Sequence, residues 1–259
     1  MAQLNWNRYS RRHIVALVLL GLVCWGIFTI STSNGGECVQ NEMRIETGDQ
    51  HCKNTPCGSE WESFKSMVET LNAVGANYTI SSGTVLSWYR DCTFSGNSDL
   101  DFNMDLTWML NNLDELHAAL RKAGWTMTDS FGTPARIGYE ESWRRYTHWW
   151  WFGSIKVDLF STAYANGEYI NGITVKGKTY PCYNTQVSSP RQSWNGISFP
   201  VPAPIEPYLI GKYSTTWKER HVKGYNWAKE PFMTDNGRRH CVKRKMPTFN
   251  WVPSNSKTD

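Results

Sequence analysis

Residues 99–106 read DLDFNMDL, a stretch in which polar and apolar side chains alternate without a break. Successive side chains of a β-strand point to opposite faces of a sheet, so the alternation predicts a strand. One face would carry Asp99, Asp101, Asn103 and Asp105, and the other would carry Leu100, Phe102, Met104 and Leu106. The apolar face is expected to pack on the core, which leaves a row of carboxylates on the opposite face.

The segment before this strand predicts two helices and a short strand. Ser59 and Glu62 have the spacing of a capping box, and apolar residues follow them at helical spacing, which predicts a helix over 60–75. Residues 78–80 indicate a short strand. A second, shorter helix is expected from Val85 to near Cys92.

The segment after the strand predicts further elements of both kinds. Leu113, Leu116, Ala119 and Leu120 indicate a helix that Gly124 ends. Strands are expected over 126–130, 135–140 and 155–160. Asn171-Gly172 is typical of a two-residue hairpin turn between strands. A Pro-rich stretch over 199–207 ends the sheet region, and 205–213 is consistent with a helix.

The charge of the chain is unevenly distributed. The 259 residues have a net charge of +4, but residues 1–30 carry +3, residues 31–211 carry −6 and residues 212–259 carry +7. A dedicated nucleic-acid binder rarely places net negative charge on its main body, so no nucleic-acid partner is expected. With 40% hydrophobic and 14% aromatic residues, the chain is expected to bury a core rather than remain disordered.

The N-terminal segment indicates where in the cell the protein is located. Residues 14–30 form an apolar run, and Arg8, Arg11 and Arg12 precede it. An apolar helix of about 20 residues spans a bilayer, with basic flanks on the cytosolic side. The pattern predicts a type II transmembrane signal anchor over 14–32, and a cleaved signal peptide is the alternative. Either interpretation places the remainder in a lumenal or extracellular space.

The cysteines agree with an oxidising compartment. One of the seven, Cys24, lies in the apolar run, which leaves an even number of disulfide candidates: Cys38, Cys52, Cys57, Cys92, Cys182 and Cys241. Six cysteines allow 15 pairings, and the spacings do not choose among them. Asn77 begins an Asn-Tyr-Thr sequon and is therefore a glycosylation candidate.

The acidic face of the 99–106 strand points to metal chemistry. Asp99 and Asp101 would stand about 6.5–7 Å apart at the backbone and would repel one another unless a cation lies between them. Carboxylate oxygens suit Mg²⁺, which also contacts substrate phosphates. Asp158, between two apolar residues of the 155–160 strand, is the candidate third ligand. The alternative is that these aspartates line a solvated sheet face.

A phosphate contact is suggested by the residues before the strand. Gly83 and Thr84 would present backbone N–H groups and a hydroxyl at a helix start, where the helix dipole favours anions. Arg90 would neutralise phosphate, or it would be an ordinary surface arginine. Lys156 is a weaker candidate of the same kind, because most such charges are simply solvated.

Three motifs in one order resemble the family of fukutin, fukutin-related protein and bacterial LicD. They are GTVLSWYR over 83–90, DLDF over 99–102 and IKVDLF over 155–160. Val201-Pro202, Tyr208-Leu209, Tyr213 and Trp217 are similar to a later family feature, and the resemblance covers about residues 60–217. The match is nearer to the fukutin-like branch. Ser98 and Ser214 depart from the Asp and Gly that many LicD-like sequences have there.

The resemblance implies an α+β, nucleotidyltransferase-like mixed sheet flanked by helices. It also implies that a phospho-alditol, phosphocholine or phosphosugar group passes from a nucleotide donor, with CDP expected, to a hydroxyl of a glycan or glycoprotein. Asp99, Asp101 and Asp158 would be the catalytic residues and would hold Mg²⁺ or Mn²⁺. Gly83, Thr84 and Arg90 would bind substrate, and the location would be the Golgi or ER membrane.

The sequence predicts five segments, and it leaves two alternatives to the phosphotransferase function. The expected parts are a cytosolic tail (1–13), the anchor (14–32), a stem (33–58), the catalytic domain (59–217) and a basic C-terminal extension (218–259). One alternative is a metal-dependent glycosyltransferase that uses its own D-x-D motif. The other is a glycan-binding member of the same fold that does not catalyse a reaction.

Overall fold

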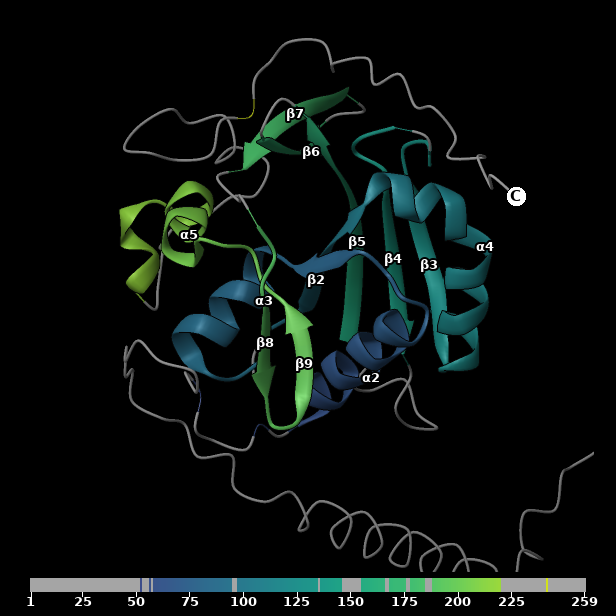
Figure 1. Ribbon diagram of the computed structural model, residues 1–259, viewed down its shortest axis with the longest axis horizontal. Helices are drawn as coiled ribbons and strands as arrows, with labels where there is room; N and C mark the ends of the chain where they lie inside the picture. The colour runs from purple at the N-terminus through teal and green to yellow at the C-terminus, as the bar shows by residue number, and fades with distance from the viewer. Residues whose placement is uncertain are drawn as a thin grey trace, which may run out of the picture. The chain divides into compact units, whose positions relative to one another are not determined.

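The computed structural model of the protein describes residues 52, 56, 58–94, 97–134, 136–145, 155–165, 168–175, 178–184, 188–219 and 241 (Figure 1). The expected tail, anchor, almost all of the stem and almost all of the C-terminal extension lie outside these residues, as do Cys38 and Cys57. No helix within the described ranges combines the length and the apolar character that crossing a membrane requires.

One sheet organises the described part of the chain. Its strands are β1 (Tyr78–Ile80), β2 (Asp99–Asp105), β3 (Trp125–Phe131), β4 (Glu140–Arg145), β5 (Ile155–Ala165), β6 (Glu168–Val175) and β7 (Lys178–Asn184). The order is β1-β2-β5-β4-β3, with β6 paired to β5 and β7 paired to β6. β2 and β5 run parallel and the other described pairs are antiparallel. The expected mixed sheet is therefore confirmed.

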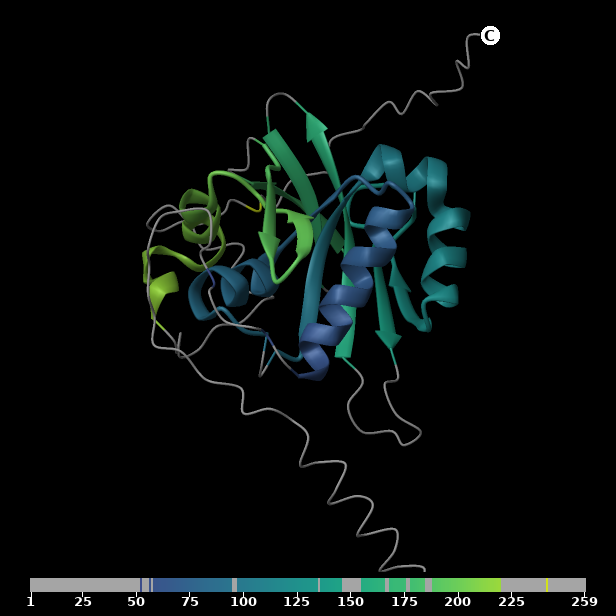
Figure 2. The ribbon, with the colours of Figure 1, turned by 60° about the horizontal axis from the view of Figure 1, so that its bottom comes forward.

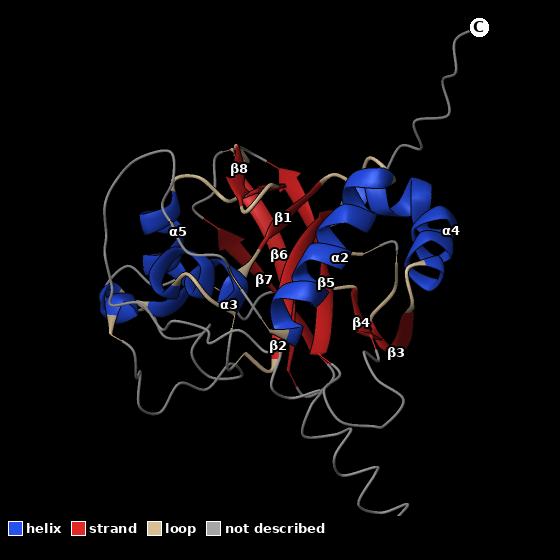
Figure 3. Ribbon diagram, turned by 90° about the horizontal axis from the view of Figure 1, so that it is seen from below, coloured by secondary structure: helices blue, strands red, loops and turns tan. Residues whose placement is uncertain are grey.

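Two helices cover the apolar face of this sheet. They are α2 (Ser59–Ala73) and α4 (Leu106–Lys122), and Figures 2 and 3 show α2 crossing the strands with α4 beside β3 and β4. Phe64 and Leu71 of α2 pack in one cluster with Leu100, Phe102 and Met104 of β2, all without exposed surface. The alternation of residues 99–105 is thus confirmed. Leu106 begins α4 instead of continuing the strand, because the Asp105 carboxylate accepts a hydrogen bond from the Trp108 N–H at 2.7 Å.

A second group of elements packs near β1 and β2. β8 (Arg191–Trp194) and β9 (Ile197–Pro200) form a separate two-stranded sheet. α3 (Ser82–Leu86) continues into a π-helical turn, η2 (Ser87–Asp91), and contacts both β2 and α5 (Ile205–Tyr213), which η3 (Thr215–Lys218) follows. The helix over 205–213 is confirmed, and the helix expected from Val85 starts earlier, at Ser82.

The capping box expected at the start of α2 is absent. Ser59 is already helical and the N-cap is Gly58, which has no side chain to offer. A capping hydroxyl must belong to the residue before the first helical one. The Ser59 hydroxyl instead donates to Glu60 Oε2 at 3.2 Å.

Two expectations in the strand region are also wrong. The strand predicted over 135–140 forms instead at Glu140–Arg145, because Gly132 and Gly138 have φ values of 81° and 88° and turn the chain before it. The hairpin turn predicted at Asn171-Gly172 is the middle of β6, where these residues pair with Cys182 and Pro181. Gly172 serves close packing: a Cβ there would lie 2.5 Å from Gly138 Cα.

Two disulfides join distant segments of the chain. They are Cys52–Cys92 and Cys182–Cys241. The first ties the segment before α2 to the end of η2, and the second ties β7 to a residue far along the chain. Four of the six disulfide candidates are thereby paired.

Candidate active site

The three aspartates predicted to act together meet on the polar face of the sheet. In the parallel β2–β5 pair, Asp101 lies directly opposite Asp158, and Asp99 lies opposite Lys156. One carboxylate oxygen from each aspartate lies within 4.8 Å of the other two. Residues at alternate positions of a strand share a face, so the register of two strands is sufficient to produce this cluster.

The start of α3 supports Asp101. The Gly83 N–H donates to Asp101 Oδ2 at 3.1 Å, and the Asp101 N–H donates to the Thr84 hydroxyl at 2.7 Å. The Ser81 N–H donates to the Asp101 carbonyl at 2.9 Å. Gly83 and Thr84, predicted to contact phosphate, thus position the Asp101 carboxylate, and the Thr84 side chain is fully buried.

Two polar neighbours hold Asp158. The Ser142 hydroxyl on β4 donates to Asp158 Oδ1 at 2.7 Å, and Lys156 Nζ lies 2.7 Å from Asp158 Oδ2. Ser142 pairs with Asp158 across β4 and β5, so both side chains emerge on one face. Asp158 is 3% exposed, and a carboxylate at this depth needs such partners.

The site concentrates negative charge. Burial, followed by the charges of Asp99 and Asp158, raises the pKa of Asp101 from 3.8 to about 7. Burial and the charge of Asp158 raise the pKa of Glu140 on β4 from 4.5 to about 7. Burial also raises the pKa of Asp158, although the hydrogen bonds from Lys156 and Ser142 oppose the shift. Each shift reflects carboxylates that are costly to ionise together without a further cation.

The donor set suits a hard divalent cation. Three carboxylates with ligand atoms this close match the oxygen-rich coordination of Mg²⁺ and Mn²⁺. Lys156 neutralises part of the charge at one edge, and the positive charge of Lys212 on α5 acts to lower the pKa of Asp101. These two ammonium groups face at least four acidic groups, so a divalent ion at the cluster would complete the charge balance.

Arg90 makes contacts that neither expectation described. Its Nε and Nη2 donate to the Asp91 carboxylate, and its Nη1 donates to the carbonyls of Trp217 and Glu219 at 3.1 and 3.0 Å. It is partly buried rather than solvated. In this structure the guanidinium joins η2 to η3, and its donors are engaged away from Asp99, Asp101 and Asp158.

The sequence analysis missed several residues of the site. Ser142 and Glu140 lie on β4, which was placed too early in the chain, and Lys156 was counted as a weak candidate. Lys212 donates to the Ser82 hydroxyl at 3.1 Å, next to Gly83. Lys156, named in the sequence analysis only as a weak phosphate contact, could have been placed beside Asp158, because the two share a strand face two residues apart. No local pattern marks Ser142 or Lys212.

Together, the fold and the site define an α+β protein with a cluster of three carboxylates that could hold a divalent metal. Over 173 residues the chain is 25% identical to the ribitol-5-phosphate transferase FKTN of Macaca fascicularis and to that of Homo sapiens. The match covers 66% of this chain and 35% of each relative, so the chain spans about a third of the length of these curated relatives. The expected resemblance to fukutin is confirmed.

Other comparisons are more distant. No family model matches the sequence. Among solved structures, the chain is similar to ANT(2″)-Ia in complex with adenylyl-2″-tobramycin, with 12% identity, a TM-score of 0.36, and coverage of 56% of this chain and 70% of the other. It is also similar to the lincomycin-bound lincosamide antibiotic adenylyltransferase LnuA, with 12% identity, a TM-score of 0.36, and coverage of 58% and 82%. Neither likeness is near enough to assign a role to any residue here.

Proposed function

We propose that this protein is a metal-dependent phosphotransferase. It moves a phosphorylated group from a nucleotide donor, CDP-linked by preference, to a hydroxyl of a glycan. The observation that carries the proposal is the meeting of Asp99, Asp101 and Asp158 on two parallel strands, beside the start of α3. The similarity to a ribitol-5-phosphate transferase supports the same class of reaction.

In this proposal, each residue of the site has a part in the reaction. Asp99, Asp101 and Asp158 would hold the divalent ion, which when bound supplies charge neutralisation at the phosphate oxygens. Lys212, at the Ser82 hydroxyl, adds positive charge beside the Asp101 carboxylate. Ser142 and Lys156 each contact one oxygen of Asp158 and so fix the orientation of the carboxylate that would receive the acceptor's proton.

The chemical step is an in-line displacement at phosphorus. An oxygen of the acceptor hydroxyl forms a new bond to the phosphorus of the transferred group, and the bond from that phosphorus to the nucleoside monophosphate breaks. The proton of the acceptor hydroxyl passes to Asp158, and the nucleoside monophosphate leaves with the electron pair of the broken bond. Positioning and charge neutralisation account for most of the catalysis in such reactions.

We also propose that the reaction takes place on the lumenal side of a Golgi or ER membrane. The basic flank and the apolar run over 14–30 support a type II anchor. The Cys52–Cys92 and Cys182–Cys241 disulfides support an oxidising compartment. Selective permeabilisation of cells that express a C-terminally tagged chain tests this: antibody access to the tag from the cytosol would contradict it.

The test is turnover of a donor panel. CDP-ribitol, CDP-glycerol, CDP-choline and nucleotide sugars are offered with an acceptor glycan, with Mg²⁺, Mn²⁺ or excess chelator, and release of the nucleotide product is measured. We expect release of nucleoside monophosphate that needs metal and falls by at least about 100-fold in Asp101→Asn, which keeps the shape of the side chain but removes its charge.

The matched control is Asp114→Asn, because Asp114 is exposed on α4, which packs on the opposite face of the sheet. It should retain wild-type turnover. Metal-independent turnover, or equal activity of the two variants, would contradict the assignment. A glycosidic bond in the product, with nucleoside diphosphate released, would favour a glycosyltransferase instead.

A further inference from the structure

A small polar cavity lies farther along the strand that carries Asp99 and Asp101. Its volume is about 30 Å³, and its walls come from β1, β2, β5, β6 and the segment before β8. Asn103, the next residue after Asp101 on the polar face of β2, is part of the wall. Two residues along a strand correspond to about 6.5–7 Å, so the cavity lies one step from the three carboxylates.

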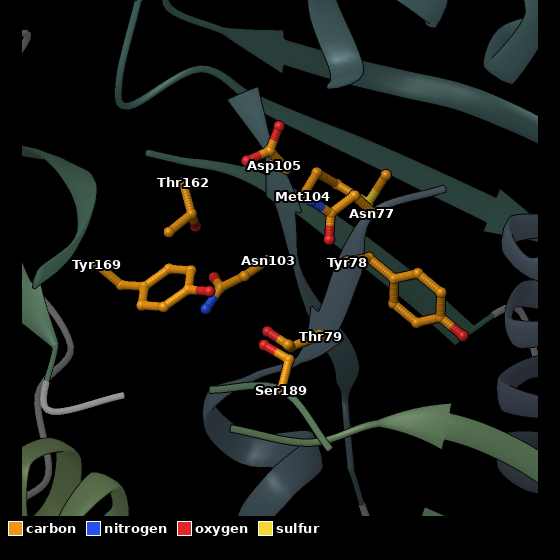
Figure 4. Close-up of a pocket in the computed structure, with 9 residues that line it drawn as sticks. All are labelled: Asn77, Tyr78, Thr79, Asn103, Met104, Asp105, Thr162, Tyr169 and Ser189. Atoms are coloured by element: carbon orange, nitrogen blue, oxygen red, sulfur yellow. The ribbon is translucent and has the colours of Figure 1, made fainter. Parts of the chain in front are cut away.

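The cavity contains polar atoms that have no partner in the part of the chain that the structure describes. Both the amide nitrogen and the amide oxygen of Asn103 are buried without a hydrogen bond to the described residues, and the same holds for the Thr162 hydroxyl. Each of these two residues is only 3% exposed. Figure 4 shows the Asn103 amide turned toward Tyr169, with Thr162 on one side and Thr79 and Ser189 on the other. Buried polar groups in native proteins almost always have partners, so these atoms indicate that something else fills the space.

The hydrogen-bonding groups of the walls indicate which kind of partner would satisfy them. An amide offers both donors and an acceptor, and a threonine hydroxyl offers one of each, which matches the hydroxyl groups of a polyol. A trimethylammonium group forms no such hydrogen bonds and would leave these atoms unsatisfied. A volume of about 30 Å³ accepts a hydroxymethyl arm or one to two waters, but not a bulky cation.

An aromatic surface lies next to the same cavity. Tyr164 and Tyr169 pair across β5 and β6, and their ring centroids are 4.9 Å apart. Tyr164 is 57% exposed, which is unusual for a large aromatic side chain in this structure. Aromatic rings offer an apolar face to the C–H groups of a carbohydrate. This pair therefore provides a stacking surface for a sugar chain next to the polar cavity.

We propose that this cavity is a hydroxyl-recognition subsite, in which Asn103 and Thr162 bind a polyol arm of a substrate held at the three carboxylates. The inference rests on the proposed phosphotransfer and adds the class of group that the site selects. The hydroxyls belong either to the transferred alditol of the donor or to the acceptor glycan. Both present the same chemistry, and the experiment separates them.

The experiment uses two variants that remove hydrogen-bonding groups and keep the number and branching of the side-chain heavy atoms, Thr162→Val and Asn103→Leu. KM and kcat are measured for CDP-ribitol, CDP-glycerol and CDP-choline, and for the acceptor. Thr126→Val is the matched control, because Thr126 is an exposed strand residue on β3. Thermal unfolding of each variant verifies that it folds.

If the donor alditol enters the subsite, each variant should raise KM for CDP-ribitol and CDP-glycerol by about 3- to 10-fold and leave KM for CDP-choline unchanged. If the acceptor enters it, KM for the acceptor should rise by a similar factor with every donor. The control should match the wild type. Unchanged KM values in folded Thr162→Val and Asn103→Leu would show that the cavity holds water only, and would overturn the inference.

A failure of the proposed function has a different signature. If the wild type turns over no donor, the subsite is tested alone, by titrating free ribitol and free glycerol into the wild type and Thr162→Val and following the protein by NMR. Shifts in the wild type that the variant loses would support the subsite. The same shifts in both proteins, or none in the wild type, would overturn it.

Discussion

At the scale of single residues, the site is governed by the cost of ionising neighbouring carboxylates. Asp101 on β2 lies opposite Asp158 on β5. Glu140 lies on β4, which pairs with β5, and the charges of Asp158 and Asp99 raise its pKa. Burial removes the water that would otherwise screen these charges, so the pKa values of Asp101 and Glu140 rise to about 7. A divalent cation would reverse this cost, which gives the free energy of unfolding a defined dependence on pH and metal.

We expect the metal-free protein to lose stability as the pH rises from about 4 to about 7. In that window the folded state holds protons on Asp101 and Glu140 that the unfolded state, with ordinary pKa values of 3.8 and 4.5, has already released. Thermal unfolding in chelator should therefore give a Tm that is a few degrees higher at pH 5.5 than at pH 8. Mg²⁺ or Mn²⁺ should raise Tm more at pH 8 than at pH 5.5, because metal and protons compete for the carboxylates.

The variant Asp101→Asn identifies the source of this effect. It keeps the side chain's size and removes its titration, so the fall in Tm between pH 5.5 and pH 8 should become shallower and the metal effect should shrink. A wild-type Tm that is flat or rises over this range in chelator would mean that ionising the carboxylates does not destabilise the folded state.

At the scale of elements, the β2–β5 register and the glycines behind it shape the site. β5 is the central strand: it pairs with β2, β4 and β6, and it presents Asp158 and Thr162 on the polar face. The loop before β4 passes so close to β6 that Gly138 and Gly172 face one another without room for a side chain. Such close backbone approach is a common use of glycine inside a strand.

We expect Gly172→Ala to reduce the free energy of unfolding by about 1–3 kcal/mol, because its Cβ would stand 2.5 Å from Gly138 Cα and the backbone would have to move. Denaturant unfolding measures the loss. Ser130→Ala, at an exposed position of β3, is the control and should stay within about 0.5 kcal/mol of the wild type. Equal stability of the two variants would show that β6 and the loop before β4 can separate freely.

At the scale of the whole molecule, the two disulfides hold segments that the sheet does not. Cys52–Cys92 spans 40 residues and Cys182–Cys241 spans 59. A cross-link of this kind stabilises a protein largely by restricting the unfolded chain, and longer loops gain somewhat more. Cys182 is fully buried on β7, so the second disulfide anchors its distant partner to the sheet.

We expect Cys182→Ser and Cys241→Ser each to lower the free energy of unfolding by about 2–4 kcal/mol. The double variant should lose no more than either single variant, since all three remove one bond. Cys52→Ser should add its own loss to any of them, because it breaks the other bond. Thiol titration provides a separate check: reactive thiols at positions 182 and 241 in the untreated protein would contradict the pairing.

Much of the fold could be read from local patterns. The alternation of residues 99–105 and the helical spacing in α2 and α4 were predicted because each depends on which side of one element is apolar. The bounds of α5 were also predicted, after the Pro-rich stretch. The same alternation identified Asp99 and Asp101, and the apolar neighbours of Asp158 identified the third carboxylate. The failures arose where two segments meet: Asn171-Gly172 has the composition of a turn, but its glycine is required by Gly138 on another segment.

The amino-acid sequence alone determined that two acidic residues share a strand face and that a third lies on another strand, because strand geometry fixes which side chains face together. Only the tertiary structure decided that β2 and β5 are parallel neighbours with Asp101 opposite Asp158. It also assigned Ser142 and Lys156 to Asp158 and directed Arg90 to Trp217 and Glu219. Around one cavity it left Asn103 and Thr162 without hydrogen-bond partners among the described residues. The reason is physical: strand pairing and register join residues far apart in the chain, and no local period encodes which strand a given strand will meet.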